Sequence, residues 1–358
     1  SIYSIPTSGI AYEFTRRFYE ILGLNTENIA ETYNSYDLLG IQSEDGEDEY
    51  VGAASYIENW TNAQQSTPDE EAAHVKFGAV VGNPPYQAAD GGGSGSSAVP
   101  IYPQLVSVAQ ATTQAVTSLV IPAKWFSGGK GLDSFRAKML SDKRIQRLVD
   151  YPDSRDVFEG VDVAGGVCYF LWDLGADGTT KVTTITGDST ETVERALDQY
   201  DVFVRDNRSL KIVEKVLSRG YGRFSDVVSA RRPFNIDSNE AGVPDGDLRL
   251  FTSKGDKRIN RDSLTKGTEL VDSWKVMFSK TASEHAGQAG KDGRKRVLSR
   301  IEVMPPESVA TESYLVIGPL DSPDVARNVA EYLGSKFVRF LLSSVLLTQN
   351  ITRQSFTF

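Results

Sequence analysis

Short apolar runs alternate with amphipathic stretches through the first half of the chain, and this alternation limits the possible folds more than any other sequence feature. The apolar runs have the length of β-strands and lie at residues 77–81, 118–121, 145–151, 166–172 and 181–185. Helical spacing of apolar residues predicts helices over residues 9–22, 101–115 and 132–140. Strands separated by helices are typical of a layered α/β fold, and we expect the runs at 77–81 and 166–172 to be buried strands.

The second half of the chain has a different pattern. A helix is predicted over residues 210–217 and a longer amphipathic helix over 324–342, with short strand-like pieces rich in turn residues between them. A chain of 358 residues suggests about two domains. We place the boundary near 200–205, which gives domains at 1–204 and 205–358. Residues 41–73 are predicted to form an acidic, mobile insertion in the first domain.

The charge is unevenly distributed along the chain. The net charge of −10 argues against a protein that simply coats DNA. Residues 1–75 contain 14 acidic and two basic residues, whereas residues 226–300 contain 15 basic and 11 acidic residues. Because phosphate contacts are made locally, an acidic protein can still bind DNA through one basic face. The alternative is that these charge runs are solvated surface.

Cysteine and histidine are scarce. One cysteine, Cys168, excludes an internal disulfide, and one cysteine with two histidines cannot form a Cys/His zinc cluster. Cys168 lies inside an apolar run and is expected to be a buried hydrophobe rather than a nucleophile. No apolar run is long enough to cross a bilayer, and the N-terminus lacks the pattern of a signal peptide, so we expect a cytoplasmic protein with no membrane partner.

The stretch KFGAVVGNPPYQ at 76–87 carries the chemistry. A predicted strand leads into Asn83, Pro84, Pro85 and Tyr86, and ligands of open α/β sheets bind at the carboxyl ends of strands. These residues suit a ligand with a planar amine, such as adenine, whose amine is a poor nucleophile because its lone pair is delocalised. The Asn83 side-chain oxygen and the Pro84 carbonyl are two acceptors for the N–H bonds of such an amine. Two prolines hold such acceptors rigidly, and Tyr86 can stack on an extruded base. The alternative is an ordinary turn after a strand.

This motif and its flanks resemble the amino-methyltransferases that carry NPPY as their fourth motif. The resemblance is to the adenine-specific (N6) DNA methyltransferases of type II restriction–modification systems, which are often fused to a nuclease. It continues through QAADGGGSGSSAVPIYPQ (87–104), IPAKWFSGGKGLDSFRAKML (121–140) and DYPDSRDVFEGVDVAGGVCYFLWD (150–173). Three further segments resemble that branch's target-recognition domain: SWKVMFSK (273–280), TESYLVIG (311–318) and SKFVRFLLSSVLLTQNITRQSFTF (335–358).

The resemblance implies a Rossmann-like methyltransferase sheet followed by a mixed α+β target-recognition domain. It implies S-adenosylmethionine as cofactor, double-stranded DNA as substrate, and a nuclease domain or subunit of the same system as partner. Phe158 matches the aromatic residue that packs on the other face of the extruded adenine, with an ordinary core phenylalanine as the alternative. Asp37 matches the acid that contacts the adenine end of the cofactor, with a turn or capping aspartate as the alternative.

The chain also departs from the family pattern. No strand followed by a Gly-rich cofactor loop precedes Asn83, and SIPTSG (4–9) has no acid where one that binds the ribose is expected. We therefore expect a piece of a longer enzyme, or a member with a reduced cofactor pocket. The run GGGSGSS (91–97) is not the missing loop, because no strand precedes it and no Gly-Lys-Ser/Thr follows it. It is either a flexible linker or a mobile loop beside the site.

Candidate DNA contacts lie in the second half. Basic loops with Lys257, Arg258 and Arg261 are expected to contact phosphates, and the polar cluster containing Gln349 and Arg353 suits base edges. Two other functions stay open. One is a DNA-binding specificity module without activity, because the cofactor loop is missing. The other is a protein glutamine methyltransferase, which also uses NPPY but usually ends soon after the motif.

Overall fold

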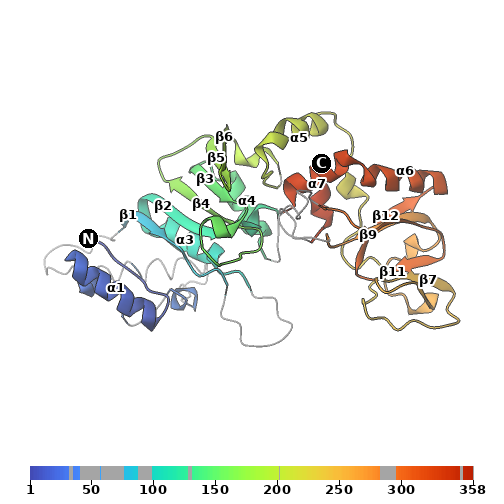
Figure 1. Cartoon of the computed structure of the whole chain (residues 1–358), viewed down its shortest axis with the longest axis horizontal. Coiled ribbons are helices and arrows are strands. Elements are labelled where there is room, and N and C mark those ends of the chain that lie inside the picture. Colours follow the sequence, from blue (N-terminus) through green and yellow to red (C-terminus); the bar gives the residue numbers. More distant parts are fainter. Residues whose placement is uncertain are drawn as a thin grey trace, which may run out of the picture. The chain divides into compact units, whose positions relative to one another are not determined.

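The chain divides into two units in the computed structural model, which describes residues 1–31, 35–40, 57, 76–87, 99–127, 131–200, 202–282, 296–346 and 350–357 (Figure 1). The first unit consists of Ser1–Tyr151 and Val167–Gln199, and the second of Pro152–Gly166 and Tyr200–Phe358. The prediction of one boundary near 200–205 did not place the segment Pro152–Gly166 in the second unit. Apart from Ile57, the acidic insertion and the glycine–serine run lie outside the described residues.

A six-stranded mixed sheet forms the centre of the first unit, with strand order β1-β2-β4-β3-β5-β6. Its strands are β1 (Phe77–Gly82), β2 (Thr113–Pro122), β3 (Ile145–Tyr151), β4 (Val167–Asp173), β5 (Thr180–Thr186) and β6 (Ser189–Arg195). The pairs β1–β2 and β3–β5 are parallel, and the others are antiparallel. The layered α/β class is therefore as expected, whereas β6 was not predicted.

The helices of this unit are α1 (Gly9–Leu22), α3 (Tyr102–Thr112) and α4 (Asp133–Ser141). α3 packs against β1 and β2. The expected helix over 101–115 ends earlier, because Thr113 pairs with Phe77 of β1 and its hydroxyl donates to the Phe77 carbonyl at 3.1 Å. Tertiary pairing thus overrides the helical pattern in residues 113–115, which begin β2.

Two strands are less buried than expected. Among the described residues β1 pairs only with β2, at one end of the sheet, and Val81 on it is 73% exposed. In β4, Cys168, Phe170 and Trp172 are buried, whereas Tyr169 between them is 38% exposed. Successive strand residues point to opposite faces, so one face of β4 is well covered and the other is partly open. The expectation of full burial for these two strands was wrong, because an apolar run does not reveal how many partners a strand has.

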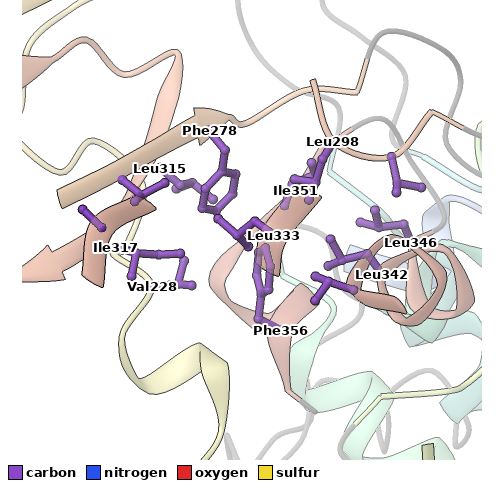
Figure 2. Packing of buried hydrophobic residues seen from close by; sticks show 14 residues of the cluster. Val228, Phe278, Leu298, Leu315, Ile317, Leu333, Leu342, Leu346, Ile351 and Phe356 are labelled. Carbon is purple, nitrogen blue, oxygen red and sulfur yellow. The ribbon is translucent and has the colours of Figure 1, made fainter. Parts of the chain in front are cut away.

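The second unit contains two three-stranded sheets with orders β10-β9-β12 and β11-β7-β8. Their strands are β7 (Leu248–Phe251), β8 (Lys257–Ile259), β9 (Trp274–Ser279), β10 (Ile301–Met304), β11 (Ser308–Ala310) and β12 (Tyr314–Leu320). Helix α5 (Leu210–Leu217) lies where it was predicted. Figure 2 shows one apolar cluster of this unit, in which Phe278 of β9 and Phe356 near the C-terminus meet with ring centroids 5.3 Å apart.

The single long helix expected over 324–342 is two helices, α6 (Pro323–Gly334) and α7 (Lys336–Val345). Ser335 separates them in an extended conformation, with φ −66° and ψ 151°, and its side chain accepts a hydrogen bond from the Val338 amide. A serine cap starts a new helix here, so both helices direct apolar residues into the cluster of Figure 2. None of the described helices has the length and hydropathy needed to cross a membrane.

Lys275 of β9 is fully buried. Its ammonium donates to the carbonyl oxygens of Val271, Ser273 and Pro305 at 3.0, 2.8 and 3.4 Å. Burial lowers the pKa of Lys275 to about 8, and the nearby Asp272 carboxylate opposes this shift. Desolvation therefore outweighs the neighbouring charge, because three carbonyl dipoles do not replace the solvation of an ammonium ion completely.

The free energy of unfolding of the second unit should rise between pH 8 and pH 10.5, because there the unfolded chain binds more protons than the folded one. Lys275 should contribute up to about 3 kcal/mol to this rise. Lys275→Met should remove the contribution, whereas Lys211→Met, at an exposed lysine of α5, should keep it. Denaturant unfolding at pH 7.5 and pH 10.5 measures the difference. Equal pH dependence in wild type and Lys275→Met would contradict the burial argument.

Candidate functional site

The NPPY motif lies directly after β1, at the carboxyl end of that strand. The last register pair of β1 with its parallel neighbour β2 joins Gly82 to Leu119. Asn83 follows and is exposed, whereas Pro84, Pro85 and Tyr86 are half-buried. Among the described residues, no hydrogen bond reaches the Pro84 carbonyl. The predicted position of the motif at a strand end is therefore correct, and among the described residues the Asn83 side chain is exposed and the Pro84 carbonyl accepts no hydrogen bond.

The other end of the motif is tied to the start of α3. The Ile101 amide donates to the Tyr86 carbonyl at 3.1 Å, and Gln87 and Pro100 form an isolated antiparallel bridge. α3 begins at Tyr102, one residue after this contact. The motif is thus held by the sheet on one side and by a helix on the other, which restricts the backbone of all four residues. The sequence analysis did not predict this connection. The sequence feature that could have indicated it is the apolar pair Ile101–Tyr102 after the glycine–serine run.

The Tyr86 side chain places its hydroxyl in a buried position. Burial raises the pKa of Tyr86 to about 12; the Cys168 thiol adds to the rise, and the Asn83 side chain opposes it. The hydroxyl has no partner with good hydrogen-bond geometry among the described residues. The pKa of Tyr102 is also raised, first by burial and then by Cys168, and its hydroxyl is likewise unpaired within the described part of the chain. Tyr86 is therefore a neutral, half-buried aromatic residue at physiological pH.

Cys168 is fully buried in β4, as the sequence predicted. A buried thiol in apolar surroundings is a poor nucleophile. The chemistry available beside the motif is therefore that of hydrogen-bond acceptors and an aromatic surface. Such groups orient and stabilise a planar amine without forming a covalent bond to it.

Comparisons with known proteins find methylases similar to this chain. Residues 1–158 match the model of the Eco57I restriction-modification methylase family. A 132-residue alignment with an uncharacterised adenine-specific methylase of Mycoplasma pneumoniae has 31% identity, and it covers 36% of this chain and 31% of that protein. The resemblance to restriction–modification adenine methyltransferases is confirmed. The chain matches about a third of the length of this relative.

Solved structures show a similar fold. A nuclease-deletion mutant of the Type ISP restriction-modification enzyme LlaGI, solved with a DNA substrate mimic, aligns with 98% of this chain and 39% of its own chain. The TM-score is 0.53 at 11% identity, which supports a shared fold for that part of LlaGI. The Type IIL enzyme MmeI, solved with DNA, aligns with 99% of this chain and 61% of its own at 11% identity, but with a TM-score of 0.44.

Phe158 belongs to the second unit, whereas the NPPY motif belongs to the first. It is half-buried and follows the short 3-10 helix Ser154–Asp156. Its amide donates to the Ser154 carbonyl at 2.8 Å, and its carbonyl accepts from the Val161 amide at 3.1 Å. Its stacking role stays a prediction. Asp37 begins the 3-10 helix Asp37–Gly40, and its side chain lies outside the described residues, so the cofactor contact also stays a prediction.

The three basic residues expected to contact phosphates are bonded within their own unit. Lys257 donates to the Glu240 carbonyl, and Arg258 donates to the Gly246 and Asp247 carbonyls. Arg261 donates to both carboxylate oxygens of Asp272 at 2.7 and 2.8 Å. These contacts hold the loops around β8 together. DNA contact by these side chains remains a prediction, and it would compete with the internal bonds.

The polar cluster near the C-terminus is described in part. Arg353 begins the 3-10 helix Arg353–Phe356, and its Nε donates to the Ser225 carbonyl at 2.7 Å. This bond connects two segments that are 128 residues apart in the sequence. Gln349 lies outside the described residues. The base-contacting role of both residues stays a prediction.

Tyr86→Phe should leave the melting temperature unchanged or raise it, because the change removes a buried hydroxyl that has no well-formed hydrogen bond to the described residues. Tyr86→Ala should lower the melting temperature, because it removes the packed ring itself. Thermal unfolding monitored by circular dichroism distinguishes the two. If both variants lost the same stability, the Tyr86 hydroxyl would have to make a hydrogen bond in the folded protein.

Proposed function

We propose that this chain contains the catalytic and target-recognition parts of a site-specific DNA methyltransferase from a restriction–modification system. The reaction is transfer of a methyl group from S-adenosylmethionine to N6 of an adenine rotated out of the duplex. The NPPY motif carries this proposal, because it lies at the carboxyl end of β1 with its backbone tied to α3, with the Asn83 side chain exposed and with no hydrogen bond from the described residues to the Pro84 carbonyl. The adenine-specific relative supports the choice of base.

The Asn83 side-chain oxygen and the Pro84 carbonyl would accept the two N–H bonds of the adenine amine. Such acceptors favour a more tetrahedral nitrogen, whose lone pair is then available to attack a methyl group. When bound, the donor would supply the methyl group from its sulfonium sulfur, and the amine held by Asn83 and Pro84 would give up one proton. Rigid placement of the acceptors matters, because they then need no reorganisation during the reaction. Tyr86 would stack on the base, and Phe158 is the proposed second aromatic contact.

The cofactor is not accommodated by the described residues of this chain. Between Ser1 and Asn83, none of the described residues forms a strand followed by a Gly-rich loop, and β1 is an end strand of the sheet. The Asp37 side chain, which the family resemblance implies as a cofactor contact, lies outside the described part. No step of the mechanism is therefore assigned to a cofactor contact. A DNA-binding specificity module without activity is the alternative that the methyl-transfer assay tests.

Double-stranded DNA is the proposed macromolecular partner. LlaGI was solved with a DNA substrate mimic, and its fold is shared along this chain. The second unit would recognise the target sequence. A nuclease domain or subunit of the same restriction system is the further partner that the family resemblance suggests.

Asn83→Ala in the full-length enzyme should reduce methyl transfer to duplex DNA by roughly 100-fold or more, because one preorganised polar contact is lost. DNA affinity should change little. Asn328→Ala, at an exposed asparagine of α6, is the matched control and should retain activity. Incorporation of tritiated methyl groups and fluorescence anisotropy measure the two quantities. Normal transfer by Asn83→Ala would contradict the mechanism, and DNA binding without transfer by the wild type would favour the inactive module.

A further inference from the structure

The loop at 231–235 in the second unit has a strained backbone. Arg232 and Asn235 have φ angles of 57° and 56°, in the left-handed region. Residues other than glycine rarely adopt this conformation, and asparagine adopts it more readily than arginine. Among the described residues other than glycine, Glu307 is the one further residue with a positive φ angle. Backbone strain persists where surrounding contacts determine the conformation, and it is concentrated at functional sites.

Several contacts hold this loop in place. Phe234 at its centre is 1% exposed and packs in the apolar cluster around β7 and β9. Ile236, the first residue after the loop, accepts a hydrogen bond at its carbonyl from the Glu312 amide at 2.8 Å. The Arg232 guanidinium forms ion pairs with Asp237 and with Glu312, the latter at 3.8 Å. The loop is therefore anchored by its core residue while its polar residues face outward.

A second loop, 264–267, packs directly against the first. The Asn235 side-chain amide donates to the Thr265 hydroxyl at 3.1 Å. Gly267 has φ 73°, and a Cβ there would lie 2.5 Å from the Pro233 carbonyl oxygen. Only glycine permits so close an approach of the two backbones. We refer to residues 231–235 and 264–267 together as the loop pair.

The loop pair carries two cations that the protein does not use internally. Arg231 and Lys266 are exposed, and neither forms an ion pair or a side-chain hydrogen bond within the described residues. Lys257, Arg258 and Arg261 differ in this respect, because each is bonded to its own unit. A cation without internal partners can bind a phosphate without first breaking a bond. A rigid loop also loses little conformational freedom on binding.

We propose that the loop pair is a DNA-contacting element of the second unit. Arg231 and Lys266 bind backbone phosphates, and the strained turn at Asn235 holds a polar side chain beside them. The proposal rests on the DNA-binding function proposed above. It moves the phosphate contacts from the loop at 257–261, where the side chains stabilise the fold, to Arg231 and Lys266, which have no such partners among the described residues. Phosphate contacts of this kind position the protein on the duplex for all sequences.

Arg231→Gln and Lys266→Gln in the complete chain should each weaken binding to a fluorescein-labelled mixed-sequence duplex. Each should also reduce the slope of log affinity against log salt by roughly one unit. The double variant should lose about tenfold in affinity at moderate salt. Lys211→Gln on α5 makes the same charge change at an exposed residue and should have little effect.

Asn235→Gly separates binding from folding. Glycine relieves the left-handed strain, which compensates for the lost Thr265 hydrogen bond, so the melting temperature should stay within a few degrees while DNA affinity falls. If the wild type does not bind the duplex at low salt, the proposed function of the chain fails. If the wild type binds but the loop-pair variants behave like Lys211→Gln, the position of the DNA surface is wrong and the function stands. Equal affinity of Asn235→Gly and wild type would likewise remove Asn235 from the DNA surface.

Discussion

The hydrogen bond from the Ile101 amide to the Tyr86 carbonyl determines how the candidate site is built. Without it, the NPPY residues would be a strand end followed by a free loop. The bridge between Gln87 and Pro100 beside it brings the chain back to the motif before α3 starts. A single backbone bond of this kind contributes only about 1 kcal/mol of stability, so its importance is positional. It restricts the backbone that joins the two proposed acceptors, and the proposed mechanism needs such rigidity.

The basic residues of the second unit fall into two groups that differ in their internal contacts. Several cations, including Lys257 and Arg261, are bonded to carbonyl or carboxylate groups of nearby loops and stabilise the fold. Others, such as Arg231 and Lys266, have no such partners in the described part of the chain. A sequence shows both kinds as equivalent basic residues. The distinction matters because a side chain that already satisfies a buried carbonyl loses that bond when it turns toward a phosphate.

Local structure was predictable where periodicity and turn residues agreed. The strands at 145–151 and 181–185 and the helix at 210–217 were predicted close to their observed positions. The errors arose where a tertiary contact overrode the local pattern. Ser335 divides a continuous helical periodicity by capping α7. Thr113 lies in a stretch with helical periodicity, but it begins strand β2 because it pairs with β1. The position of Phe158 in the second unit depends on contacts that no local pattern encodes.

The sequence by itself determined the chemistry of the NPPY residues, the strand that precedes them and the family to which they point. These properties depend on residue type and on spacing over about ten positions, which a sequence displays directly. Tertiary structure alone decided that β1 is an end strand, that the motif is tied to Ile101, and which cations are free. Each of these depends on groups that are far apart in the chain, and the packing that brings them together is set by the whole fold.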